Sequence, residues 1–306
     1  MTPRHAVLLL LLACLPFQSA IAQTAKPAPA PAVTAPTPAA PASTAPAASG
    51  RSGVAGDHNV LLSDRIPPEQ QVQLQAGDDQ FAARYIADLS PEHRGVVIVL
   101  HDSGQHRSWP HTVAALLDEL PLHGWSTLAL ELPPPQSNTL LTGSEAGVEK
   151  QAQARIDAAL AKLVELNGGA QPTVVIGFGS GAWRAADLAR RLAEGNGAKL
   201  PEPIRALVLV DPRNQLPAAT ADLPKLLPTT ALPTFDIVQN SAALTLADRE
   251  ARRRAVLHQK ERIYQQLLLP PLNATGNDEQ TVLIKRIRSW MQRYVPPEEK
   301  KKSPAK

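Results

Sequence analysis

The sequence lacks cysteine almost entirely and has no long apolar run. Its one cysteine, Cys14, lies in residues 6–16, an apolar stretch about half as long as the roughly 20 residues of a membrane-spanning helix. This stretch follows the basic Arg4 and precedes a small-x-small motif at residues 20–22, Ala-Ile-Ala. Such a pattern is typical of a secretory signal peptide. We therefore expect residues 1–22 to be removed and the protein to be periplasmic or secreted.

Cleavage after Ala22 would leave a mature chain with no disulfide, no thiolate chemistry and no membrane span. Two alternatives stay open. The apolar stretch could be retained as a membrane anchor, or Cys14, which follows Leu-Leu-Ala at residues 11–13, could carry a lipid.

The chain also lacks a large net charge. The net charge is +3, and Arg4 together with the lysine-rich residues 298–306 accounts for all of it. The rest of the chain is neutral and offers no basic face to phosphate groups. This argues against nucleic acid as a partner.

Large apolar residues are nearly absent from residues 23–56, which consist mainly of Ala, Pro, Thr and Ser. Such a segment cannot bury enough surface to offset its ordering entropy, so we expect a disordered linker. Residues 297–306 are predicted to be a basic disordered tail. The remaining residues, 57–296, are enough for a single domain with a buried core.

Strand-like and helix-like segments alternate along residues 57–296. This alternation predicts an α/β fold, with a mostly parallel central sheet flanked by helices. Strands are predicted at residues 70–75, 81–87, 95–100, 126–132, 172–176, 204–212, 233–238 and 263–269. Helices are predicted at residues 110–120, 144–166, 182–194, 248–260 and 279–294.

One segment has the context of a nucleophile elbow but lacks the nucleophile. Residues 177–181, Gly-Phe-Gly-Ser-Gly, lie between a predicted strand and helix, as the G-x-S-x-G motif does. Its apex is Gly179, which has no side chain. Ser180 could replace it only if the turn shifted, and Phe178 would then stand where the turn tolerates only a small side chain. We expect Ser180 to cap or pack the next helix, with a nucleophilic role as the alternative.

A base is missing as well, because no histidine occurs in residues 270–278, after the last predicted strand. His258 is interpreted as a solvated residue of a charged helix. Two aspartates are candidate acids: Asp211, which also suits a turn before a proline, and Asp236, which lies inside a predicted strand.

Polar side chains gather after the strand at residues 95–100. They are His101, Asp102, Ser103, His106 and His111. Hydrogen bonds that shape the loop are the preferred interpretation. A metal site and a nucleophile–base pair formed by Ser103 and His106 are the alternatives, and both rest on weak spacing signals. No metal site is predicted.

The glycines also match the dinucleotide fingerprint G-x-G-x-x-[GA]. The acidic residue that should follow about 20 residues later is missing, since Asp211 comes more than thirty residues after Gly177. No cofactor is predicted. The remaining binding hypothesis is a small anion on the amides around Gly177, Gly179, Ser180 and Gly181.

The order of elements resembles the α/β-hydrolase fold over residues 61–294. Four segments are similar to those of a narrower family: residues 100–110, 123–125, 177–182 and 232–237. That family, domain of unknown function 3530, comprises exported proteins of Gram-negative bacteria and is placed in the α/β-hydrolase superfamily without a settled activity. The resemblance implies the fold. It also implies that Asp102 replaces a glycine in the loop that usually supplies an oxyanion donor.

We therefore expect an exported protein of α/β-hydrolase fold that lacks serine-hydrolase chemistry. It would act as a binding or envelope-interaction module for a small molecule or an envelope protein. The first alternative is a weak ester or amide hydrolase that uses Ser180 with His101 or His106 as the base. The second is a bulk scaffold tethered by the linker.

Overall fold

The computed structural model describes most of the predicted domain. The described residues are 66–102, 109–133, 145–169, 171–195, 204–216, 219, 221–230, 232–239, 243–259, 262–270 and 277–296. All of them belong to one compact unit, residues 53–306. The predicted signal peptide, linker and tail lie outside the described residues.

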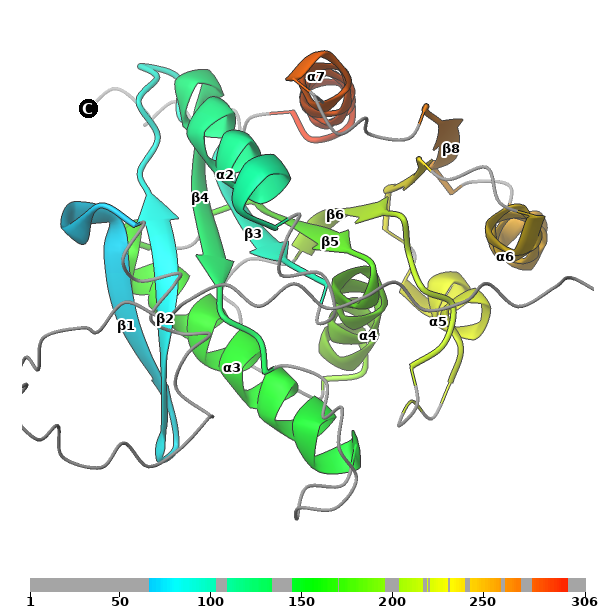
Figure 1. Ribbon diagram of the computed structural model, residues 1–306, viewed down its shortest axis with the longest axis horizontal. Coiled ribbons are helices and arrows are strands. Elements are labelled where there is room, and N and C mark those ends of the chain that lie inside the picture. The colour runs from blue at the N-terminus through cyan, green and yellow to red at the C-terminus, as the bar shows by residue number, and fades with distance from the viewer. Residues whose placement is uncertain are drawn as a thin grey trace, which may run out of the picture. The chain divides into compact units, whose positions relative to one another are not determined.

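A mostly parallel, eight-stranded sheet forms the centre of this unit (Figure 1). The strand order is β1-β2-β4-β3-β5-β6-β7-β8. Pairing is antiparallel between β1 and β2 and between β2 and β4, and it is parallel between all later neighbours. The strands are β1 (Gln71–Ala76), β2 (Asp79–Ile86), β3 (Gly95–Leu100), β4 (Trp125–Leu130), β5 (Thr173–Phe178), β6 (Ile204–Val210), β7 (Thr234–Val238) and β8 (Tyr264–Leu268).

Helices cover both faces of the sheet (Figure 1). Helices α2 and α7 pack on one face, and α3, α4 and α5 pack on the other. Helix α6 contacts α5. The helices are α2 (Trp109–Glu119), α3 (Glu145–Leu166), α4 (Ser180–Ala193), α5 (Leu223–Thr230), α6 (Ala243–Val256) and α7 (Asn277–Tyr294), with short 3-10 turns η1 (Pro68–Gln70) and η2 (Leu120–His123).

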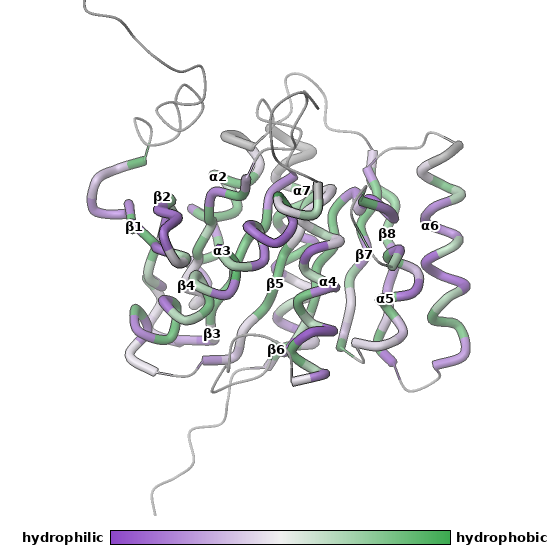
Figure 2. Tube along the Cα trace, turned by 90° about the horizontal axis from the view of Figure 1, so that it is seen from below, coloured by the Kyte–Doolittle hydropathy of each residue, from purple (hydrophilic) through white to green (hydrophobic). Residues whose placement is uncertain are grey.

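The two helical layers explain why strand β3 has no polar residue. In β3, the side chains of Val96, Ile98 and Leu100 belong to the core under α3 and α4. Those of Val97 and Val99 belong to the core under α2 and α7. A strand covered on both faces has no solvent side, and Figure 2 shows the hydrophobic colour along the central strands. In the described part of the chain, no helix combines the length and apolar character needed to cross a bilayer.

The predicted fold class is confirmed: a mostly parallel sheet lies between two layers of helices. Two predictions of elements need correction. The helix predicted at residues 248–260 is α6, which begins at Ala243 and ends at Val256, so His258 lies in the turn beyond it. Helix α5 was not predicted. It contains Pro224 and Pro228, and proline is tolerated in the first turn but disfavoured further along a helix.

Candidate functional site

The turn between β5 and α4 has the sharp geometry of an elbow. Gly179 at its apex has φ +55° and ψ −114°, a conformation that strains any residue with a side chain. The turn is also tightly packed, because a Cβ atom on Gly181 would lie 2.1 Å from the carbonyl oxygen of Leu100. Packing therefore requires glycine at residue 181, and the backbone conformation favours glycine at residue 179.

The carboxylate of Asp102 occupies the space where a nucleophile would stand. Asp102 follows β3, the strand beside β5 in the sheet. A Cβ atom built on Gly179 would lie 2.4 Å from both Cγ and Oδ2 of Asp102. A side chain at the apex and the present position of the carboxylate exclude one another.

Three donors hold this carboxylate in place. Oδ1 of Asp102 accepts hydrogen bonds from the backbone N–H of Ser180 at 3.2 Å and from the Ser180 hydroxyl at 2.8 Å. Oδ2 accepts one from Nη2 of Arg213 at 2.8 Å. In serine hydrolases with this elbow, the N–H of the residue after the nucleophile donates to the oxyanion. The equivalent donor here, the N–H of Ser180, is bound to a carboxylate of the same chain.

Ser180 itself is buried, with 3% of its surface exposed, and opens helix α4. Gly179 is the N-cap residue of that helix, and no side-chain hydrogen bond caps it. The Ser180 hydroxyl packs at the first turn and donates to Asp102 rather than pointing into open solvent.

His101 is buried and both of its ring nitrogens take part in shaping the loop. Nε2 accepts a hydrogen bond from the N–H of Leu132 at 3.1 Å, so the ring proton lies on Nδ1. Nδ1 then donates to the backbone carbonyl of Asp102 at 3.0 Å. A histidine bound in this way has no nitrogen available to accept a proton from Ser180. His106, the other candidate base, lies outside the described residues.

The candidate acid Asp211 lies at the carboxyl edge of the sheet. It follows β6 with a positive φ of 45°, which aspartate tolerates better than most residues. Its Oδ1 atom accepts a hydrogen bond from the N–H of Gln239 at 2.6 Å. Burial raises the pKa of the Asp211 carboxyl above its ordinary value.

Asp236 lies elsewhere, inside β7 and with no exposed surface. Its carboxylate pairs with Arg252 of α6 at 2.8 Å and accepts hydrogen bonds from Tyr264 at 2.6 Å and from Gln266 at 2.8 Å. Burial, together with this carboxylate, raises the pKa of the Tyr264 hydroxyl above its ordinary range. Arg252 also donates to Oδ1 of Asn214 at 2.8 Å, which connects the network to the loop after β6.

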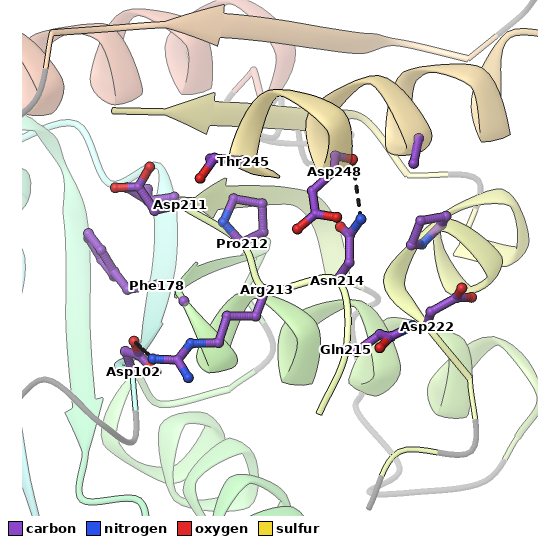
Figure 3. A pocket seen from close by; sticks show the side chains of 14 residues that line it. Asp102, Phe178, Asp211, Pro212, Arg213, Asn214, Gln215, Asp222, Thr245 and Asp248 are labelled. Atoms are coloured by element: carbon purple, nitrogen blue, oxygen red, sulfur yellow. Dashed lines mark hydrogen bonds and ion pairs between the residues drawn. The ribbon is translucent and has the colours of Figure 1, made fainter. Parts of the chain in front are cut away.

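A cavity of about 760 Å³ opens at the carboxyl ends of the parallel strands (Figure 3). Its walls come from the ends of β3, β5 and β6 and from α5 and α6. This is the edge at which open α/β sheets bind ligands. The charged residues that line it are Asp102, Asp211, Arg213, Asp222 and Asp248. No group of three or more metal-binding side chains is placed to hold a metal ion within the described ranges.

Arg213 and Asn214 were missed from the sequence. Arg213 donates its backbone N–H to the carbonyl of Gly179 at 3.1 Å in addition to its side-chain contact with Asp102. Asn214 is nine-tenths buried and donates to the backbone carbonyl of Asp248 at 3.2 Å. Both follow the strand that ends at Val210, so their place at the carboxyl edge of the sheet was the available signal.

The family model named "Protein of unknown function (DUF3530)" matches residues 5–152 and 144–293. The chain belongs to this family. No curated protein matched the chain.

Solved structures of α/β hydrolases resemble the fold of this DUF3530 member. A putative alpha/beta hydrolase of unknown function from Agrobacterium tumefaciens has a TM-score of 0.56 at 18% identity, over 74% of this chain and 100% of that one. Dienelactone hydrolase from Anabaena variabilis has a TM-score of 0.53 at 19% identity, over 74% and 99%. The esterase domain of a Rhodothermus marinus protein has a TM-score of 0.52 at 14% identity, over 74% and 98%. These similarities show that the chain has the fold of α/β hydrolases.

Proposed function

We propose that this DUF3530 protein is a non-catalytic member of the α/β-hydrolase superfamily that binds a ligand in the cavity beside the elbow. The observation that carries the proposal is the position of Asp102. Its carboxylate fills the place of the nucleophile side chain and takes the backbone donor that would serve an oxyanion.

Electrostatics make acyl transfer at this site unfavourable. A tetrahedral intermediate would develop its negative charge next to the Asp102 carboxylate. Two like charges about 4 Å apart repel by about 4 kcal/mol at the effective dielectric constant of a protein surface. The same carboxylate also accepts the hydrogen bond from the Ser180 N–H, so this donor is not available to an oxyanion. Loss of one such donor lowers the rate of a hydrolase about 100- to 1,000-fold.

Labelling with a fluorophosphonate probe tests the proposal. The full chain, its Ser180→Ala variant and an active serine hydrolase as positive control are incubated with the probe, and incorporation is measured by intact mass. We expect no stoichiometric labelling of the protein. Stoichiometric labelling that disappears in Ser180→Ala would show that the protein is a serine hydrolase.

A weak ester or amide hydrolase is the second candidate, and one contact favours it. The Ser180 hydroxyl lies 2.8 Å from a carboxylate that could accept its proton. Arg213 opposes this role, because its guanidinium already pairs with the Asp102 carboxylate at 2.8 Å. The burial of Ser180 opposes it too.

The proposed setting is the cell envelope. The leader at residues 1–22 supports export to the periplasm, with cleavage after Ala22. N-terminal sequencing of protein from a periplasmic fraction should begin at Gln23. A chain that starts at Met1, or one blocked by lipid at Cys14, would contradict this.

An envelope protein as partner, or a bulk scaffold tethered by residues 23–56, is tested separately. Pull-down from envelope extracts is compared for the full chain and for a variant without that segment. A partner recognised by the domain is retained by both. A tethering role predicts that removal of the segment abolishes the association.

A further inference from the structure

Helix α6 lies at the end of the sheet that β8 forms and turns one face to solvent (Figure 2). We call that face the outer stripe; its residues are Leu246, Glu250, Arg253 and Leu257. The two leucines are 37% and 54% exposed, and the charged side chains are 42% and 49% exposed. Leu257 follows the last helical residue, and its N–H still donates to the carbonyl of Arg254 at 3.4 Å.

The outer stripe is separate from the cavity. The residues of α6 that line the cavity are Thr245, Asp248 and Ala251. At 100° per residue they lie on the side of the helix opposite the outer stripe. An inference drawn from the stripe is therefore independent of the proposed function.

The spacing of the outer stripe makes the helix complementary to a second copy of itself. Its residues are four, three and four positions apart, which is the spacing of the seam positions in a coiled coil. The order is apolar, acidic, basic, apolar. When two copies run in opposite directions, Leu246 faces Leu257 of the second copy, and Glu250 faces Arg253 of the second copy.

Charge selects the antiparallel orientation. In a parallel pair, Glu250 would face Glu250 and Arg253 would face Arg253, so both contacts would repel. In an antiparallel pair both contacts join opposite charges, and twofold symmetry makes each of them occur twice. Within one copy, Arg253 donates to both carboxylate oxygens of Glu250, at 2.7 and 2.8 Å. The second copy extends this pair into a cluster of four alternating charges.

The residue that flanks the outer stripe does not disturb this arrangement. Arg254 is 67% exposed and lies beside the stripe, 3.6 Å from Glu250. In the antiparallel pair it would lie opposite the exposed Ala247 of the second copy, so it meets no like charge there. An anionic lipid surface fits the stripe less well, because its two charges cancel and an interfacial helix needs a basic polar face.

We propose that α6 forms the contact of a symmetric, antiparallel dimer of this chain. The helix has 14 residues and is therefore about 21 Å long. One pair of such helices buries less than the roughly 800 Å² per partner of a standard interface. We therefore expect a weak dimer, with a dissociation constant on the order of 100 µM and a monomer at low micromolar concentration.

Sedimentation velocity of the full chain, from low micromolar to near-millimolar concentration, tests the inference. We expect a reversible monomer–dimer equilibrium. Glu250→Arg should weaken the dimer about tenfold or more, because both symmetry-related contacts change from attraction to repulsion. Arg253→Glu should do the same. An equimolar mixture of the two variants should form a heterodimer, since every contact across the axis then joins opposite charges again. A local effect on the helix would not be repaired by mixing.

The control variant is Glu165→Arg, which reverses an exposed glutamate of a similar ion pair, with Lys162, on helix α3. It should dimerise as the unchanged protein does. The inference is wrong if the protein stays monomeric at every concentration, if Glu165→Arg weakens the dimer as much as Glu250→Arg, or if the mixed variants form no heterodimer. A monomer that sediments with phosphatidylglycerol vesicles would assign the outer stripe to a lipid surface and overturn the dimer.

Discussion

Gly179 has no side chain, and the carboxylate of Asp102 fills the space beside its Cα atom. The positions of the two residues depend on each other. The glycine leaves room for the carboxylate, and the carboxylate receives the N–H and hydroxyl of Ser180. The space at the apex is therefore filled through a pair of residues that follow the neighbouring strands β3 and β5.

Substitution of Gly179 by alanine tests how tightly that space is filled. The positive φ of 55° costs about 1 kcal/mol for a residue with a side chain, and displacement of Asp102 should cost about 2 kcal/mol more. We expect a total loss of about 3 kcal/mol in the free energy of unfolding, measured by urea denaturation.

Gly195→Ala is the matched control for this change. Gly195 also has a positive φ, of 74°, but a Cβ atom there would meet nothing within 4 Å. It should lose only the backbone contribution, about 1 kcal/mol. Equal losses in the two variants would mean that the Asp102 carboxylate moves aside at no cost.

At the level of secondary-structure elements, a buried ion pair joins the last strands to α6. Asp236 of β7 and Arg252 of α6 are both almost fully buried. Tyr264 and Gln266 of β8 complete the shell around the carboxylate. Arg252 extends the network to Asn214 in the cavity wall, so α6, β7, β8 and the loop after β6 are held together through one guanidinium.

Arg252→Met should therefore destabilise the protein strongly. It leaves the Asp236 carboxylate buried without a cation, and loss of one partner of such a pair costs about 3–5 kcal/mol. Urea denaturation measures the loss. Arg253→Met, on the exposed side of the same helix, should leave the unfolding midpoint unchanged. A similar shift in both variants would mean that loss of a helix arginine, rather than the buried pair, is responsible.

At the level of the whole molecule, the fold was predictable because the spacing of apolar residues identified most segments as strands or helices. The apolar run at residues 95–100 is strand β3, and the apolar periodicity of residues 144–166 is helix α3. Helix α5 was not predicted, because its two prolines are unfavourable in a helix and made the segment look irregular. A local sequence pattern does not predict an element when tertiary packing overrides the intrinsic helix propensity of its residues.

The site was predictable only in part, for a different reason. The missing side chain of Gly179 and the unusual Asp102 are visible in the sequence. Their contact is not, because it depends on the adjacency of β3 and β5. Asp102 and Arg213 pair although they are 111 positions apart in the sequence, and no sequence pattern near either residue predicts their contact.

The clash between Asp102 and any side chain at residue 179 also limits how the sequence can evolve. A serine introduced at the apex meets the aspartate, and removal of the aspartate alone takes away the acceptor of the Ser180 N–H and hydroxyl. Each single step is unfavourable although the double change relieves the clash. The two positions are therefore expected to depend on each other, so that the residue at 102 limits which residues can stand at 179.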